Sequence, residues 1–354
     1  MKIYIRSSAC ISAQKTFETD DFLTDPVTYD QLSIKAIEPN YASYIEPKSI
    51  RRMSYMIKMG VSAAKNCLDQ AGEAMPGAII TGTALGCITD TATFLSRMIE
   101  MNEELLPATS FIQSTHNTVA AQVALALKCH NYNNTFVHKG ISFESALTDA
   151  LMLLKEGGAD NVLVGGIDEI TEISYKIFSR LGLLKRRPVN NLELFDNPSK
   201  GALAGEGTAF FLLTGAASPA NIARLDGVQT FYKLKDAASV EQKISDFLAR
   251  QNLTIADVDL VINGENSDIH NDAIYHELNC SYFKNVSLAR YKHLSGDYSV
   301  SSSFALWLAA NIVKRGEVPG VIKHRFVLQQ APKKVLIYNH YLNIYHSVML
   351  VSTM

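Results

Sequence analysis

Short apolar runs and longer segments with apolar residues every three or four positions alternate along the chain. The first pattern is typical of buried strands and the second of helices. Strands are predicted at residues 78–82, 135–138, 161–166, 208–213, 222–228, 259–263, 335–338 and 347–351, the last two as a closing hairpin. Helices are predicted at residues 50–72, 118–128, 143–156, 239–251 and 301–315, the last as an amphipathic helix. This alternation predicts an α/β fold.

The predicted elements fall into two similar β-α-β halves. A segment of small residues with a proline, from Thr214 to Asn221, is the best candidate joint between them. The sequence therefore predicts an N-terminal half of residues 1–215 and a C-terminal half of residues 216–354.

One segment predicts a functional turn. Residues Asn134-Thr-Phe-Val-His-Lys-Gly-Ile-Ser-Phe-Glu-Ser-Ala-Leu-Thr-Asp-Ala150 read as a strand, a tight turn at Gly140 and a helix. This is the geometry of a nucleophile elbow, which presents one side chain at a helix N-terminus. Gly140 has no side chain to present. A plausible physical reason is that glycine relieves backbone strain at the tip of the turn.

Composition removes several classes of function. The 354 residues are 47% hydrophobic and carry a net charge of -2, so no broad electrostatic surface for nucleic acid is expected. No apolar run is long enough to span a membrane, and residues 1–8 look like a first strand and not a signal peptide. The five cysteines are scattered, which predicts no disulfide framework, no metal site and a cytoplasmic protein.

Four motifs, in order along most of the chain, resemble the β-ketoacyl synthases of the thiolase fold. They are Gly82-Thr-Ala-Leu-Gly86, Pro107-Ala-Thr-Ser-Phe-Ile-Gln-Ser-Thr-His-Asn-Thr-Val-Ala-Ala-Gln122, Gly158-Ala-Asp-Asn-Val-Leu-Val-Gly-Gly-Ile-Asp-Glu169 and Phe195-Asp-Asn-Pro-Ser-Lys-Gly-Ala-Leu-Ala-Gly-Glu-Gly207. The resemblance implies a thiolase-like fold with two pseudo-repeated halves in α-β-α-β-α layers. It also implies a dimer, with the small-residue helix 118–128 near the two-fold interface.

The family's chemistry needs a cysteine at the elbow and two histidines that assist decarboxylation. Counting from the flanking motifs, the resemblance places Gly140 at the nucleophile. The first histidine position falls on Gly264. The second falls on Asp297 in Lys292-His-Leu-Ser-Gly-Asp297, where the family's lysine, Lys292, is retained. The Gly-rich gating loop is replaced by residues 338–346, which contain no glycine.

Three histidines are possible substitutes for the missing groups: His138 beside the elbow, His270 after Gly264, and His293 next to Lys292. The alternative is that His138 ends a strand, His270 belongs to an ordinary loop or helix start, and His293 is structural. Glu206 in the fourth motif is expected to fix backbone turns.

The resemblance implies a catalytically silent subunit of the chain-length-factor class, which partners an active ketosynthase and an acyl carrier protein. It implies no cofactor. The segment Ser110 to Thr118 looks most like ketosynthases of aryl-polyene or flexirubin-type pathways. Two alternatives stay open: an active 3-oxoacyl synthase or decarboxylase that uses displaced residues, and an acyl-chain-binding homodimer without catalysis.

Overall fold

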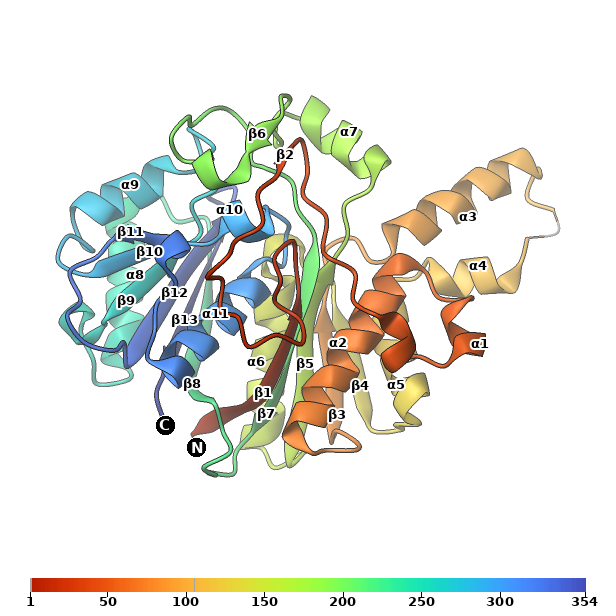
Figure 1. Cartoon of the computed structure of the whole chain (residues 1–354), viewed down its shortest axis with the longest axis horizontal. Helices are drawn as coiled ribbons and strands as arrows, with labels where there is room; N and C mark the ends of the chain where they lie inside the picture. Colours follow the sequence, from red (N-terminus) through yellow and green to blue (C-terminus); the bar gives the residue numbers. More distant parts are fainter. Residues whose placement is uncertain (1, 105) are drawn as a thin grey trace.

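The computed structural model describes residues 2–104 and 106–354 and is built around one mixed sheet (Figure 1). Within these residues the sheet has eleven strands in the order β11-β10-β9-β12-β13-β8-β1-β7-β5-β3-β4. Their bounds are β1 Ile3–Ile11, β3 Ala78–Gly82, β4 Tyr132–Phe136, β5 Asn161–Asp168, β7 Gly207–Thr214, β8 Ala223–Tyr232, β9 Leu260–Asn263, β10 Ser287–Arg290, β11 Lys323–Arg325, β12 Lys334–Tyr341 and β13 Tyr345–Ser352. A separate pair is formed by β2 (Asp30–Gln31) and β6 (Val189–Asn190).

Ten of the eleven strands form two copies of one pattern, and β11 adds an antiparallel edge strand beside β10. In the first half β3 runs parallel to β4 and β5, β7 is antiparallel to β5, and β1 is antiparallel to β7. In the second half β9 runs parallel to β10 and β12, β13 is antiparallel to β12, and β8 is antiparallel to β13. The halves meet where β1 pairs with β8. The two predicted pseudo-repeated halves are therefore present. The placement of the domain boundary between residues 215 and 216 stays a prediction.

Helices cover both halves and fill the space between them. The helices α6 (Ser142–Lys155) and α11 (Ser302–Arg315) contact strands of both halves and form the middle layer. The outer face of the first half carries α2 (Tyr55–Ala71) and α5 (Thr118–Leu127). The outer face of the second carries α8 (Ala237–Ala249) and α9 (Ala273–Cys280). This arrangement gives the predicted α-β-α-β-α layers.

The remaining helices lie in the connections. An arm made of α3 (Ile88–Glu100) and α4 (Ala108–Gln113) extends away from the body, and α7 (Glu172–Arg180) lies at the opposite end of the molecule from the two termini (Figure 1). The short helical turns are α1 Pro47–Ile50, α10 Lys292–Ser295, η1 Tyr41–Ser43, η2 Lys139–Ile141, η3 Asn191–Glu193, η4 Ile255–Asp257 and η5 Gly320–Ile322.

Three predictions for single elements were wrong. The predicted buried strand 135–138 is the edge strand β4, which is exposed or half-buried because it pairs with β3 alone among the described strands. Helix α11 is not amphipathic in its surroundings, because packing between the two halves buries most of its side chains. Helix α2 begins five residues later than predicted, at Tyr55, and ends at Ala71, where Gly72 with a φ of 70° caps it next to the predicted end.

The N-terminal strand, the cysteines and the helix lengths complete the description of the fold. Strand β1 begins at Ile3, and Met1 lies outside the described residues. All five cysteines are free, and four of them are buried. Among the described residues, no helix combines the length and the apolarity that a membrane crossing requires.

Candidate functional site

The predicted elbow is present. Strand β4 ends at Phe136, the turn η2 contains Gly140, and α6 starts at Ser142. The Ser142 hydroxyl accepts a hydrogen bond from the His138 backbone N–H and donates one to the Lys139 carbonyl, both at 2.8 Å. The strained residue of the turn is Lys139, with a φ of 47°. The hypothesis that Gly140 relieves strain is therefore wrong, because its own φ lies outside the left-handed region.

A tyrosine occupies the space into which an elbow side chain would point. A Cβ atom at Gly140 would lie 2.2 Å from Tyr341 Cβ and 2.3 Å from Tyr341 Cγ, closer than such contacts occur in proteins. Tyr341 is the last residue of β12 and is held by a tight turn, in which Ile344 N–H donates to the Tyr341 carbonyl at 3.0 Å. The turn residues Leu342 and Asn343 have φ values of 54° and 53°, so the chain makes a type I′ turn without glycine.

Gly264 is enclosed in the same way. It follows β9, and its N–H donates to the Tyr338 carbonyl at 3.0 Å. A Cβ atom there would lie 2.1 Å from Asn339 Oδ1 and 2.6 Å from Tyr275 Oη. A histidine at this position needs a different arrangement of Asn339 on β12.

Asp297 and Lys292 form a buried ion pair. Lys292 Nζ lies 2.8 Å from Asp297 Oδ1, and Asn266 Nδ2 donates to Asp297 Oδ2 at 2.8 Å. The lysine side chain is 4% exposed and the aspartate side chain 25%. Burial is the largest single influence and lowers the pKa of Lys292, but Asp297, Tyr291 and Asp272 together outweigh it, and the pKa ends above its ordinary value. Lys292 is therefore a permanent cation that holds Asp297, and not a proton acceptor.

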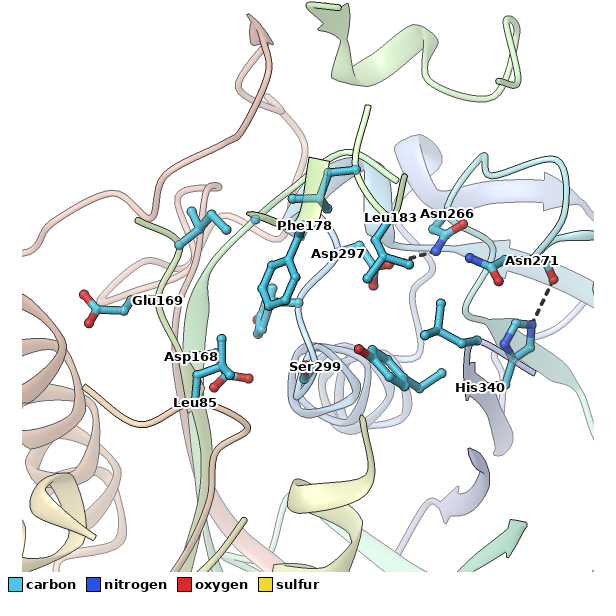
Figure 2. A pocket seen from close by; sticks show the side chains of 16 residues that line it. Leu85, Asp168, Glu169, Phe178, Leu183, Asn266, Asn271, Asp297, Ser299 and His340 are labelled. Atoms are coloured by element: carbon cyan, nitrogen blue, oxygen red, sulfur yellow. Dashed lines mark hydrogen bonds between the residues drawn. The ribbon is translucent and has the colours of Figure 1, made fainter. Parts of the chain in front are cut away.

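The end of β12 brings the three family positions into one region. Tyr341 packs on Gly140, and Asn339 packs on Gly264. Tyr341 lines the same small cavity as Asp297, which is labelled in Figure 2. The cavity volume is about 80 Å³, enough for a few water molecules but below the size of an ordinary ligand pocket. No group of three or more His, Cys, Asp or Glu side chains that could hold a metal ion occurs among the residues that the structure describes.

Two buried cavity residues escaped the sequence reasoning. His340 Nε2 lies 3.0 Å from the Asn271 carbonyl oxygen (Figure 2). Its ring also stacks on Tyr275, with 4.5 Å between the ring centroids. Burial, with smaller contributions from His346 and Lys292, lowers the pKa of His340 well below its ordinary value. His340 belongs to the segment 338–346, but nothing in the sequence of that segment indicated that its side chain would be buried beside the cavity.

Asp168 is the other such residue. Its Oδ1 accepts hydrogen bonds from Thr83 Oγ1 at 2.8 Å and from the Ala84 N–H at 2.9 Å. Burial raises the pKa of Asp168 to about 6. The motif 158–169 contained Asp168, but the sequence carried no signal that this carboxylate faces the cavity.

None of the three candidate substitutes lines this cavity. His138 is exposed, with its ring centroid 5.6 Å from that of Tyr345, and His270 is also exposed. His293 is buried, and its Nε2 lies 3.1 Å from the Val321 carbonyl oxygen. Burial lowers the pKa of His293 to about 4, so the ring is neutral. These positions favour an ordinary structural role for all three.

The comparisons with known proteins decide the family. Residues 27–218, more than half of the chain, match the model of the family described as "Beta-ketoacyl synthase, N-terminal domain". The chain belongs to the β-ketoacyl synthase family. No curated protein sequence matches it.

Solved structures confirm the thiolase-like fold of this member of the β-ketoacyl synthase family. The chain is similar to "The ishigamide ketosynthase/chain length factor" with a TM-score of 0.81 and 16% identity, covering 100% of this chain and 99% of the other. It is similar to a β-ketoacyl synthase from Burkholderia phymatum STM815 with a TM-score of 0.80, 16% identity and coverages of 100% and 99%. A ketosynthase in complex with its chain length factor from Xenorhabdus doucetiae gives a TM-score of 0.75, 14% identity and coverages of 100% and 98%.

Glu206 shows what the synthase motif at residues 195–207 does in this chain. Its buried carboxylate accepts hydrogen bonds from the Ile170 N–H, Lys35 Nζ, the Ala36 N–H and Tyr55 Oη, at 2.9 to 3.2 Å. One carboxylate thus joins three separate segments of the first half. The matching of Gly140, Gly264 and Asp297 to the family's catalytic triad stays a prediction.

Proposed function

We propose that this chain is a catalytically silent β-ketoacyl synthase-like subunit of the chain-length-factor type. It pairs with an active ketosynthase in the cytoplasm and contributes to fatty-acid or polyketide-type chain assembly on an acyl carrier protein. The observation that carries the proposal is the contact between Gly140 and Tyr341, because a tyrosine ring fills the space that an acyl-accepting side chain requires.

The electrostatics around the elbow also support silence. Decarboxylation of a malonyl thioester needs groups that stabilise an enolate. The residues at the matched positions are Gly264, which has no side chain, and Asp297, whose negative charge would oppose an enolate. The cation that could offset this charge, Lys292, is already paired with Asp297.

The surface of the first half supports pairing with a second thiolase-like chain. Strand β4 leaves one side of its backbone unpaired among the described strands. The neighbouring arm of α3 and α4 carries large exposed apolar side chains: Leu95, Ile99, Phe111 and Ile112. On α5, Leu125 is exposed as well, while Val119, Ala120 and Val123 pack inward. An apolar surface next to an open sheet edge fits a large, permanent interface.

The neighbours agree with this kind of assembly. Two of the similar structures are named as a ketosynthase with a chain length factor, and a third as a ketosynthase with a type II polyketide acyl carrier protein. Their identities of 14 to 16% support the architecture, and the aryl-polyene or flexirubin pathway stays a prediction.

Co-expression tests the proposal. The chain is expressed alone and with an intact ketosynthase of the same organism, and each preparation is measured by light scattering after size exclusion. We expect a one-to-one complex that Ile99→Asp with Phe111→Asp abolishes. The matched control Val327→Asp, an exposed apolar residue of the second half, leaves the complex intact. A stable homodimer that ignores the ketosynthase would favour the acyl-binding alternative.

Silence is tested separately on the isolated chain. Radiolabelled malonyl-carrier protein is supplied and released carbon dioxide is counted. We expect no release above the protein-free rate. Release that is lost in His270→Ala would overturn the proposal and favour an enzyme with displaced residues.

A further inference from the structure

A second hollow lies far from the Gly140 elbow. This groove of about 600 Å³ is lined by the end of α6, the start of β12, the start of β8 and the end of α8. Its lining includes Lys2 and Ile3 at the N-terminal end of the chain, which lies at the same end of the molecule as the C-terminus (Figure 1). Strand β12 has Lys334 at the groove and Tyr341 at the cavity, so the two sites are separated by about 23 Å along the strand.

The groove concentrates positive charge on a chain whose net charge is -2. Among the described residues that line it there is one carboxylate, Asp226, against five cationic side chains: Lys2, Lys155, Arg224, Arg250 and Lys334. Asp226 lies at a bulge between β8 and β13. Its carboxylate already forms an ion pair with Arg224 and accepts a hydrogen bond from the Ser352 hydroxyl.

The other four cations are open to a ligand. Arg250 donates to the neutral side-chain oxygen of Gln229 at 3.1 Å. Lys334 lies near enough to Asp257 to influence its pKa, but that carboxylate is fully exposed and bound to Thr254. No carboxylate within the described residues lies within 4 Å of the ammonium or guanidinium groups of Lys2, Lys155, Arg250 or Lys334.

The floor of the groove is apolar. Leu151 of α6, Leu225 of β8 and Phe247 of α8 line it and are almost fully buried, and Leu253 is half-buried at its side. A cationic rim over an apolar floor suits a ligand with several negative charges attached to an apolar or aromatic body. A volume of about 600 Å³ is within the range of ordinary small-molecule sites.

We infer that this groove binds a small organic polyphosphate, with its phosphates on Lys155, Arg250 and Lys334 and its apolar body against the half-buried Leu253. The groove lies at the opposite end of the sheet from the elbow, so the inference does not depend on the proposed pairing with a ketosynthase. Binding is expected to weaken as salt rises, because the contacts are between exposed charges.

Isothermal titration of the full chain with magnesium-free ATP tests the inference, and inorganic tripolyphosphate serves as a probe without an apolar body. We expect ATP to bind, and Lys155→Glu with Arg250→Glu to weaken binding by about a hundredfold, about tenfold for each lost charge-assisted contact. Tripolyphosphate should bind several times more weakly than ATP. The ATP affinity of the neutral pair Lys155→Gln with Arg250→Gln should lie between that of the wild type and that of the glutamate pair. Circular dichroism checks that each variant is folded.

The control is Lys243→Glu, which reverses an exposed charge on the same helix α8 outside the groove. It should leave the ATP affinity within about twofold, since distant surface charges are screened. Absence of ATP binding at millimolar concentration, or equal weakening by Lys243→Glu and by the groove pair, would overturn the inference. Equal affinity for ATP and tripolyphosphate would overturn the assignment of the apolar floor.

Discussion

Gly140→Ala is the smallest change that probes the plugged elbow. The new methyl group would lie 2.2 Å from Tyr341 Cβ, whereas ordinary contacts of this kind begin near 3.4 Å. Because the Tyr341 Cβ is fixed to the backbone, rotation of its ring cannot remove the clash, and the hairpin of β12 and β13 must shift. Overpacking of this kind costs about 1–3 kcal/mol. We expect Gly140→Ala to lower the free energy of unfolding by that amount, measured by urea titration.

A double-mutant cycle isolates the contact. Tyr341→Ala keeps the clashing Cβ, so Gly140→Ala should stay costly in that background. Tyr341→Gly removes the Cβ, and there Gly140→Ala should cost less than about 0.5 kcal/mol, which leaves a coupling energy of about 1–3 kcal/mol. The control is Gly320→Ala, where a Cβ would meet no atom within 4 Å and the change should be close to neutral. An equal cost of Gly140→Ala in the wild-type and Tyr341→Gly backgrounds would refute the reasoning.

Three further predictions follow from the buried charges and the elbow. Asp297→Asn leaves the buried cation of Lys292 without its partner and should lower the free energy of unfolding, measured by urea titration, by about 3–5 kcal/mol. Lys292→Met should cost less because Asp297 is partly exposed, and the double variant should recover much of the loss. Asp168→Asn should raise stability by up to about 3 kcal/mol at pH 8 and have little effect near pH 4. The folded-state pKa of about 6 lies above the unfolded value of about 4, so the carboxyl lowers stability progressively as pH rises from about 4 to about 6 and by a constant amount above that. Urea titrations at pH 4, 6 and 8 measure this, and a gain that does not change with pH would contradict it. In Gly140→Cys with Tyr341→Gly, the new cysteine should be modified by a thiol-reactive reagent, as measured by mass spectrometry. The variant should still release no carbon dioxide from malonyl-carrier protein, since Gly264 and Asp297 remain. Measurable release would show that the elbow alone limits the chemistry.

Local sequence patterns predicted most of the fold. The elements β3, α6 and β5 lie within two residues of their predicted bounds because apolar runs, Gly157-Gly158 and the elbow are local signals. The errors at β4 and α11 share one cause. Burial in a strand or helix depends on which neighbours cover it, and the two halves that enclose α11 are distant in sequence.

The candidate site was predicted only in part. The positions Gly140, Gly264 and Asp297 came from motif spacing in the resemblance to the family. Tyr341 was not recognised as the plug, because its contact with Gly140 joins residues 201 positions apart and depends on the register of the β12–β13 hairpin. No local pattern encodes such a register.

The open edge of β4 has a consequence for the cell. A strand with unpaired N–H and C=O groups next to exposed apolar side chains is a template for aggregation until another chain covers it. In the proposed heterodimer, chains made in excess of the ketosynthase would be the first to aggregate or to be degraded. For that assembly, the ratio at which the two chains are synthesised would be under selection, because each unpaired chain exposes its sheet edge and is lost.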